Sequence, residues 1–119
     1  MSKFRVQKSV STIAVPASAQ ATFSALTVPL NGVLWQHKVK IVSNSDAAAT
    51  MTLNIIDADG DVVYTKATIS GSAGTVVGTV LTGDTRVPLN GLYTVQIVFS
   101  ANQTTTANTV TVTLLIDRG

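Results

Sequence analysis

Cysteine is absent from this chain, which excludes disulfide bonds and thiolate metal sites and leaves the redox compartment unmarked. The sequence also lacks any run of the roughly 18 to 20 apolar residues that a membrane-spanning helix requires. The first residues carry charge without an apolar run behind them, so we expect no signal peptide. These absences predict a protein made in a cytoplasm, with no membrane partner.

Charge is scarce as well. Charged residues make up 12% of the chain, and glutamate is missing altogether. Disordered chains combine much charge with little apolar content, whereas this chain is 45% hydrophobic, so we expect it to fold. The net charge of +2 is small, and the sequence therefore gives no reason to expect nucleic acid as a partner.

The plentiful residues favour strands over helices. Thr and Val are frequent, and both are β-branched residues that suit a pleated sheet. No segment keeps the apolar spacing of a helix, while alternation of apolar and polar residues recurs throughout. Val39 and Ile41, for example, alternate with Lys38 and Lys40. The alternation predicts strands at residues 3–7, 11–15, 21–28, 34–43, 50–57, 62–66, 75–81, 92–100 and 109–116.

The predicted fold class is all-β: an antiparallel two-sheet sandwich or jelly roll of eight to nine strands. The length of 119 residues fits a single β-sandwich domain covering residues 1–119. The strand order does not follow from the pattern. Within residues 1–8, Lys3 and Arg5 alternate with Phe4 and Val6, which suits either an edge strand of this sandwich or an arm that adds to a neighbour's sheet.

A five-residue motif occurs twice. Val-Pro-Leu-Asn-Gly at residues 28–32 returns at residues 87–91, and each copy precedes an alternating strand, a polar loop and another alternating strand. Because Asn-Gly accommodates positive φ, we expect tight turns at Asn31-Gly32 and Asn90-Gly91. Two interpretations remain open: the copies build the same corner of a sandwich, or they present two similar loops to a quasi-symmetric partner.

The one carboxylate cluster is Asp57, Asp59 and Asp61. A calcium-binding EF-hand loop needs Gly at its sixth position and Glu at its twelfth, and here Gly60 stands fourth and Thr68 twelfth. The EF-hand is thus excluded, and Asp59-Gly60 predicts a hairpin turn between two strands. A looser calcium site in this loop stays open as an alternative.

Neither an enzyme nor a zinc protein is predicted. His37 is the sole histidine, no Gly-x-Ser-x-Gly motif accompanies it, and zinc would depend mostly on carboxylates. We expect no catalytic residue, no metal site and no cofactor, with His37 a strand residue near the surface. Trp35 shares strand parity with His37, Val39 and Ile41, so we expect it to begin on the buried face. As the only tryptophan, it is either a core anchor or an interface residue.

As a whole, the chain resembles the small all-β decoration, or cement, proteins on the heads of tailed bacteriophages. The resemblance rests on the absent cysteine, the abundant Thr, Val, Ala and Ser, the lack of helical periodicity, and the terminal alternating strand at residues 109–116. It implies a non-enzymatic virion protein that binds the major capsid protein on the outer capsid surface, at contacts between coat subunits. It also implies a homo-oligomer, as a dimer or trimer.

On this resemblance, we expect the interface to combine the amino-terminal segment with one end of the sandwich. The candidate residues are Lys3, Phe4, Arg5, Val6, Asn31, Gly32 and Trp35. Two alternatives stay open. A carbohydrate- or receptor-binding module of a phage tail or fibre would need aromatic platforms, whereas the aromatic residues here are dispersed. A small coat protein of an RNA phage would end in helices, whereas this chain is predicted to end in a strand.

Overall fold

The computed structural model describes residues 6–18, 20–25, 27–45, 49–76, 80–81, 85–104 and 107–118. They form eight strands: β1 (Val6–Val15), β2 (Thr22–Ser24), β3 (Val28–Ile41), β4 (Thr50–Asp57), β5 (Val62–Ser70), β6 (Gly74–Val76), β7 (Val87–Phe99) and β8 (Asn108–Asp117). All of the strand pairings are antiparallel. The described residues contain no helix with the length and apolar character that crossing a membrane requires.

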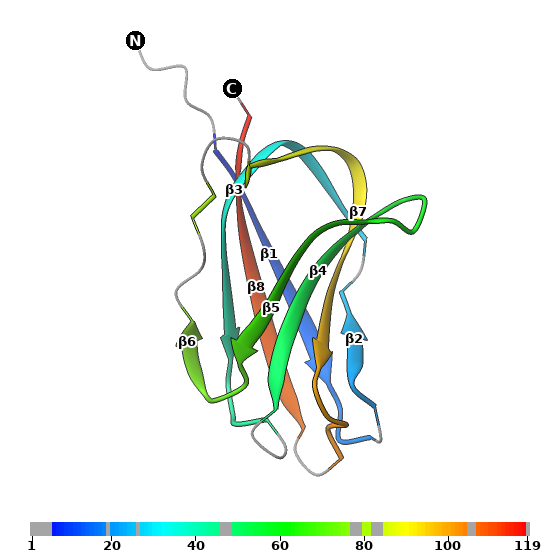
Figure 1. The fold of residues 1–119 in the computed structure, drawn as a ribbon, viewed down its shortest axis with the longest axis vertical. Helices are drawn as coiled ribbons and strands as arrows, with labels where there is room; N and C mark the ends of the chain where they lie inside the picture. Colours follow the sequence, from blue (N-terminus) through cyan, green and yellow to red (C-terminus); the bar gives the residue numbers. More distant parts are fainter. Residues whose placement is uncertain are drawn as a thin grey trace.

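The strands form two stacked layers that belong to one continuous hydrogen-bonded sheet (Figure 1). One layer has the order β1-β8-β3-β6, and the other has the order β2-β7-β4-β5. The first halves of β3 and β7 pair with each other and join the layers at one end. The smallest dimension of the molecule is 21 Å, which suits two sheets packed about 10 Å apart with side chains outside them. The fold is therefore an antiparallel β-sandwich of the jelly-roll type, as the alternation predicts.

Alternate residues of both layers fill the space between them. Met51, Leu53 and Ile55 on β4 are all 0% exposed, and so are Val110, Val112, Leu114 and Ile116 on β8. Full burial of such a side chain stabilises the fold by roughly 1.5–3 kcal/mol, so this core supplies most of the favourable free energy. The burial confirms the alternation predicted for residues 50–57 and 109–116.

The two copies of the repeated motif pair with each other at the end that joins the layers. Asn31 lies opposite Asn90, while Leu30 and Gly32 lie opposite Gly91 and Leu89. This register is symmetric, so a local two-fold axis passes between the two asparagines. The prediction of tight turns at Asn31-Gly32 and Asn90-Gly91 is wrong, because both dipeptides lie inside long strands. The positive φ is present, 133° at Gly32 and 131° at Gly91, but the chain does not reverse there.

The local axis relates the two halves of the chain. β3 corresponds to β7 and β4 to β8, while the edge strands β1 and β5 and the short strands β6 and β2 occupy matching places in opposite layers. The structure thus confirms the interpretation that the two copies build the same corner.

Other boundaries also differ from the prediction. One strand, β1, replaces the two predicted over residues 3–15, and both β2 and β6 are shorter than expected. The predictions for residues 3–5, 26 and 77–79 lie outside the described residues.

The two equivalent glycines give a matched test of the corner. A Cβ at Gly32 would lie 2.4 Å from the Asp117 carbonyl oxygen, whereas a Cβ at Gly91 would meet nothing within 4 Å. Both Gly→Ala substitutions share the strain of positive φ, of order 1–3 kcal/mol. We expect Gly32→Ala to lose roughly 1–3 kcal/mol more than Gly91→Ala, because the end of β8 must shift. Urea unfolding of both variants measures the difference, and equal losses would contradict this account of the corner.

Candidate functional site

Two of the predicted interface residues, Val6 and Asn31, come together at the end where β3 and β7 pair. Val6 begins β1 and is 43% exposed, and Asn31 is exposed on the corner. Gln7, next to Val6, forms hydrogen bonds from its side chain to the β3 backbone at this corner. Its side-chain Nε2 donates to the Pro29 carbonyl oxygen at 3.1 Å, and its Oε1 accepts from the Asn31 N–H at 3.4 Å. The remaining amino-terminal candidates, Lys3, Phe4 and Arg5, lie outside the described residues.

Gly32 and Trp35 shape the same end. Gly32 is half-buried against the end of β8, as described above. The pairing of β3 with β8 slips between Leu34 and Gln36, so Trp35 is the extra residue of a β-bulge. Trp35 is half-buried, and its carbonyl oxygen accepts the N–H of Leu81 at 2.6 Å. The expectation that it begins on the core face is wrong, because the bulge interrupts the alternation.

His37 is buried between the layers, so the expectation of a surface position is wrong. It is 2% exposed, and its Nε2 lies 2.9 Å from the hydroxyl of Tyr64, on β5 of the other layer. Burial lowers the pKa of His37, with the Lys66 charge acting in the same direction, and burial raises the pKa of Tyr64. Both shifts favour the neutral forms, so the pair makes an uncharged contact across the sandwich. Its shared parity with Val39 and Ile41 was the sequence signal for this burial.

The Asp57 carboxylate organises the β4–β5 turn. Its Oδ1 accepts the N–H of Asp59 at 3.0 Å and that of Asp61 at 2.9 Å, and the Gly60 N–H bonds to the Asp57 carbonyl. These bonds confirm the predicted hairpin. Across the part of the chain that the structure describes, no group of three His, Asp or Glu side chains is placed to hold a metal ion.

The outer faces of the two layers differ in chemistry. On the β2-β7-β4-β5 layer, neutral side chains satisfy one another: the Thr65 hydroxyl donates to Asn54 Oδ1 at 2.7 Å, and Asn54 Nδ2 donates to Gln96 Oε1 at 3.0 Å. The outer face of β1, β8 and β3 is basic, and we refer to it as the lysine face. Its main residues are Lys8, Val10, Gln36, Lys38, Lys40, Thr113 and Leu115.

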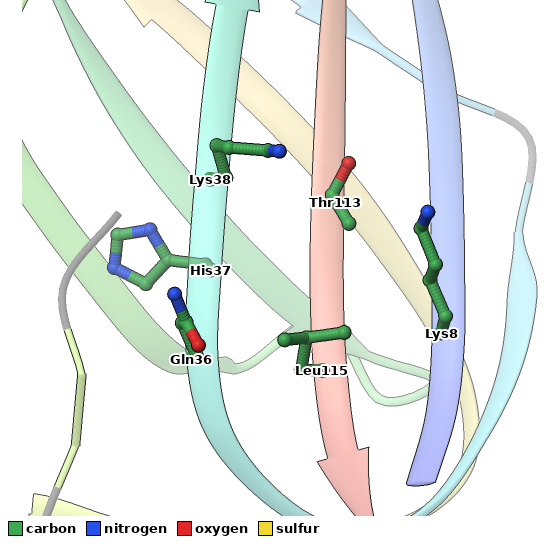
Figure 2. A pocket seen from close by; sticks show the side chains of 6 residues that line it. All are labelled: Lys8, Gln36, His37, Lys38, Thr113 and Leu115. Atoms are coloured by element: carbon green, nitrogen blue, oxygen red, sulfur yellow. The ribbon is translucent and has the colours of Figure 1, made fainter. Parts of the chain in front are cut away.

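A depression of about 200 Å³ opens on the lysine face. Its lining includes side chains from three neighbouring strands, with Lys8 on β1, Leu115 on β8, and Gln36 and Lys38 on β3 (Figure 2). Two ammonium groups beside a neutral floor suit a polar or anionic side chain of a partner.

No protein-family model matches the chain, and no curated protein matches it in sequence. Solved structures share its fold. A chain of the cyanophage Pam1 capsid asymmetric unit matches 98% of this chain over 86% of its own length, with a TM-score of 0.61 and 17% identity. The structure of infectious bursal disease virus, Gx strain, matches 99% of this chain over 33% of its own chain, with a TM-score of 0.51 and 14% identity. At these identities the similarity establishes a shared fold with components of virus capsids.

Acidification should weaken the sandwich through His37. Its pKa is lowered on folding from an ordinary value of 6.5, so the unfolded chain binds the proton more readily. The contribution of neutral His37 to the free energy of unfolding is complete at pH values above 6.5. It is lost as the pH falls through the pKa of His37 in the folded protein. Thermal unfolding between about pH 8 and about pH 5 measures this loss.

His37→Val is the matched control for the pH series, because Val95 occupies the equivalent place in the other half. We expect this variant to keep a flatter unfolding temperature over the same pH range. The same pH dependence in both proteins would assign the effect to other groups.

Proposed function

We propose that this chain is a non-enzymatic accessory protein of a virus particle that binds the outer capsid surface at contacts between coat subunits and stabilises the shell. The match to a chain of the cyanophage Pam1 capsid asymmetric unit carries the proposal, because it covers nearly the whole of both chains at a TM-score of 0.61. That chain is therefore close to this one in size. The match to the infectious bursal disease virus structure, by contrast, covers a third of a larger chain.

The surface supports a mechanical role. Strands hold the outer faces and the corner rigid, so little conformational entropy is lost when they dock. When many copies bind one shell, their interfaces together stabilise it strongly, even where the affinity of each single contact is weak. The partner in this proposal is the major capsid protein, and the chain acts on the particle surface as a dimer or trimer.

The proposed contact lies at the corner end. Val6 and Asn31 are exposed there, and the segment containing Lys3, Phe4 and Arg5 immediately precedes β1. Gly32 and Trp35 contribute by shaping this end.

The alternative of a carbohydrate-binding module on a tail or fibre receives less support. Sugar-binding platforms use exposed aromatic rings, and all described aromatic side chains, Trp35 and Tyr64 included, are buried or half-buried. A family 6 carbohydrate-binding module matches 96% of this chain over 92% of its own length, but at a TM-score of 0.45 and 12% identity, which carries no argument.

Quantitative mass spectrometry of purified particles from the source tests the proposal. We expect this chain in a fixed ratio to the main shell protein. A few copies per particle would point instead to a tail or fibre, and absence from the particle would overturn a virion role.

Removal of residues 2–5 should abolish binding to particles that lack the protein while leaving the fold intact. The deletion stops at residue 5 because Val6 already pairs with Asp117 in the β1–β8 ladder. Co-sedimentation with particles measures binding, and circular dichroism measures the fold. A variant of unchanged length, with Ser and Gly at residues 2–5, separates the loss of side chains from the loss of chain. Wild-type binding by both variants would exclude this segment from the interface.

A further inference from the structure

The lysine face is a regular grid of outward side chains across three strands. Lys8, Leu115 and Gln36 form one row, in which each residue lies opposite its neighbour on the next strand. In the next two rows, Val10 and Thr113 lie beside Lys38, and Thr12 and Thr111 lie beside Lys40. Lysines therefore stand on both sides of a neutral central strand, and β1 and β3 are about 10 Å apart.

The ammonium groups of this face are available to a partner. None of Lys8, Lys38 and Lys40 forms an ion pair with another described residue. The one carboxylate on the described parts of β1, β3 and β8 is Asp117, which lies opposite Val6 at the corner end, one row from Lys8. Asp57, Asp59 and Asp61 belong to the β4–β5 turn, and this turn lies apart from β1 and β8 (Figure 1). The face therefore presents positive charge that no other described residue neutralises.

The opposite outer face offers a partner much less. Its Thr65, Asn54 and Gln96 side chains already bond to one another in a row across three strands. A partner docking there would have to replace those bonds without gaining any charge attraction. An acidic partner is therefore attracted to the lysine face and not to the neutral face. This attraction orients the protein as it docks and raises the rate of association.

Apolar side chains among the lysines indicate the class of partner. Val10 is 53% exposed, and Leu115 helps to line the depression between Lys8 and Lys38. Surfaces that bind nucleic acid usually add arginine and exposed aromatic rings that stack on bases. The outward residues described on β1, β8 and β3 include no arginine, and Trp35, the aromatic residue of the β3 bulge, is half-buried. Mixed lysine, valine and leucine instead fit a protein surface in which carboxylates surround an apolar or polar side chain that can enter the depression.

We propose that the lysine face docks the protein onto a carboxylate-rich protein surface of the particle. This inference rests on the proposed function and deepens it, because it sets the side of the sandwich that faces the shell. Val6 is an outward residue of the same strand as Lys8, so the lysine face continues into the corner end. The neutral face then points away from the shell.

The test measures binding to particles that lack the protein over a series of salt concentrations. The first variant, Lys8→Gln/Lys38→Gln/Lys40→Gln, removes three positive charges from the lysine face. The control, Thr22→Glu/Ser24→Glu/Thr50→Glu, changes the net charge by the same amount on exposed positions of the opposite layer. Thermal unfolding of both variants verifies that they fold.

We expect the glutamine variant to bind roughly tenfold more weakly than wild type at low salt and to lose most of its salt dependence, with the control unchanged. Equal weakening of both variants would show that net charge alone matters and would overturn the proposal. Wild-type binding by the glutamine variant would overturn it too, while leaving the proposed function in place. Failure of the wild-type protein to bind would overturn both. Tighter binding of wild type to double-stranded DNA or heparin than to particles would assign the face to a phosphate or sulfate polymer.

Discussion

The pairing of Asn31 with Asn90 sets the geometry on which the remaining strands depend. Around this pair, the first halves of β3 and β7 lie side by side, and their second halves enter opposite layers. β8 then pairs with the second half of β3, and β4 pairs with the second half of β7, so each layer contains strands from both halves of the chain. Neither layer can therefore form from a continuous piece of sequence. The Gly32 φ of 133° and its tight approach to β8 leave no room for a side chain at this position of the corner.

Two departures from the internal symmetry fall on β3. Trp35 is an extra residue with no counterpart in β7, and His37 stands where β7 has Val95. The imidazole of His37 requires a polar partner, which Tyr64 supplies from the other layer. This contact links the edge strand β5, whose residues are mostly exposed, to β3 in the other layer. β5 itself is interrupted by a register shift beside Thr68, whose φ is 61°. An interrupted edge discourages pairing of β5 with another sheet.

The sequence predicts the core well because burial imposes a period of two on every strand. The alternation of Met51, Leu53 and Ile55, or of Val39 and Ile41, shows directly which residues face inward. The turns at Asn31 and Asn90 were predicted wrongly, since the positive φ of the following glycine serves a bend within a strand as well as a reversal. Whether the glycine lies in a bend or in a reversal depends on pairing with a strand far along the chain, as β3 pairs with β7 here.

In the candidate site, too, some features follow from the local sequence pattern and others depend on pairing between distant strands. The outward positions of Lys38 and Lys40 follow from their alternation with Val39 and Ile41. Their proximity to Lys8 depends on the strand order β1-β8-β3, which no local pattern contains. The contact of His37 with Tyr64 does not follow from local sequence for a similar reason, because Tyr64 lies on another strand.

A shared fold does not decide function, so the distribution of charge carries more weight than the architecture. At physiological salt the Debye length is about 8 Å, and each lysine of the lysine face therefore acts only on groups close to it. Carboxylates of a partner must come nearly into contact before they are attracted, which makes such attraction a guide to orientation. Persistence of the complex then depends on the apolar contact of Val10 and on how well a side chain fills the depression beside Leu115. A face with few charges and a shaped centre thus suits a partner presented in many identical copies, where correct orientation matters more than the strength of any single contact.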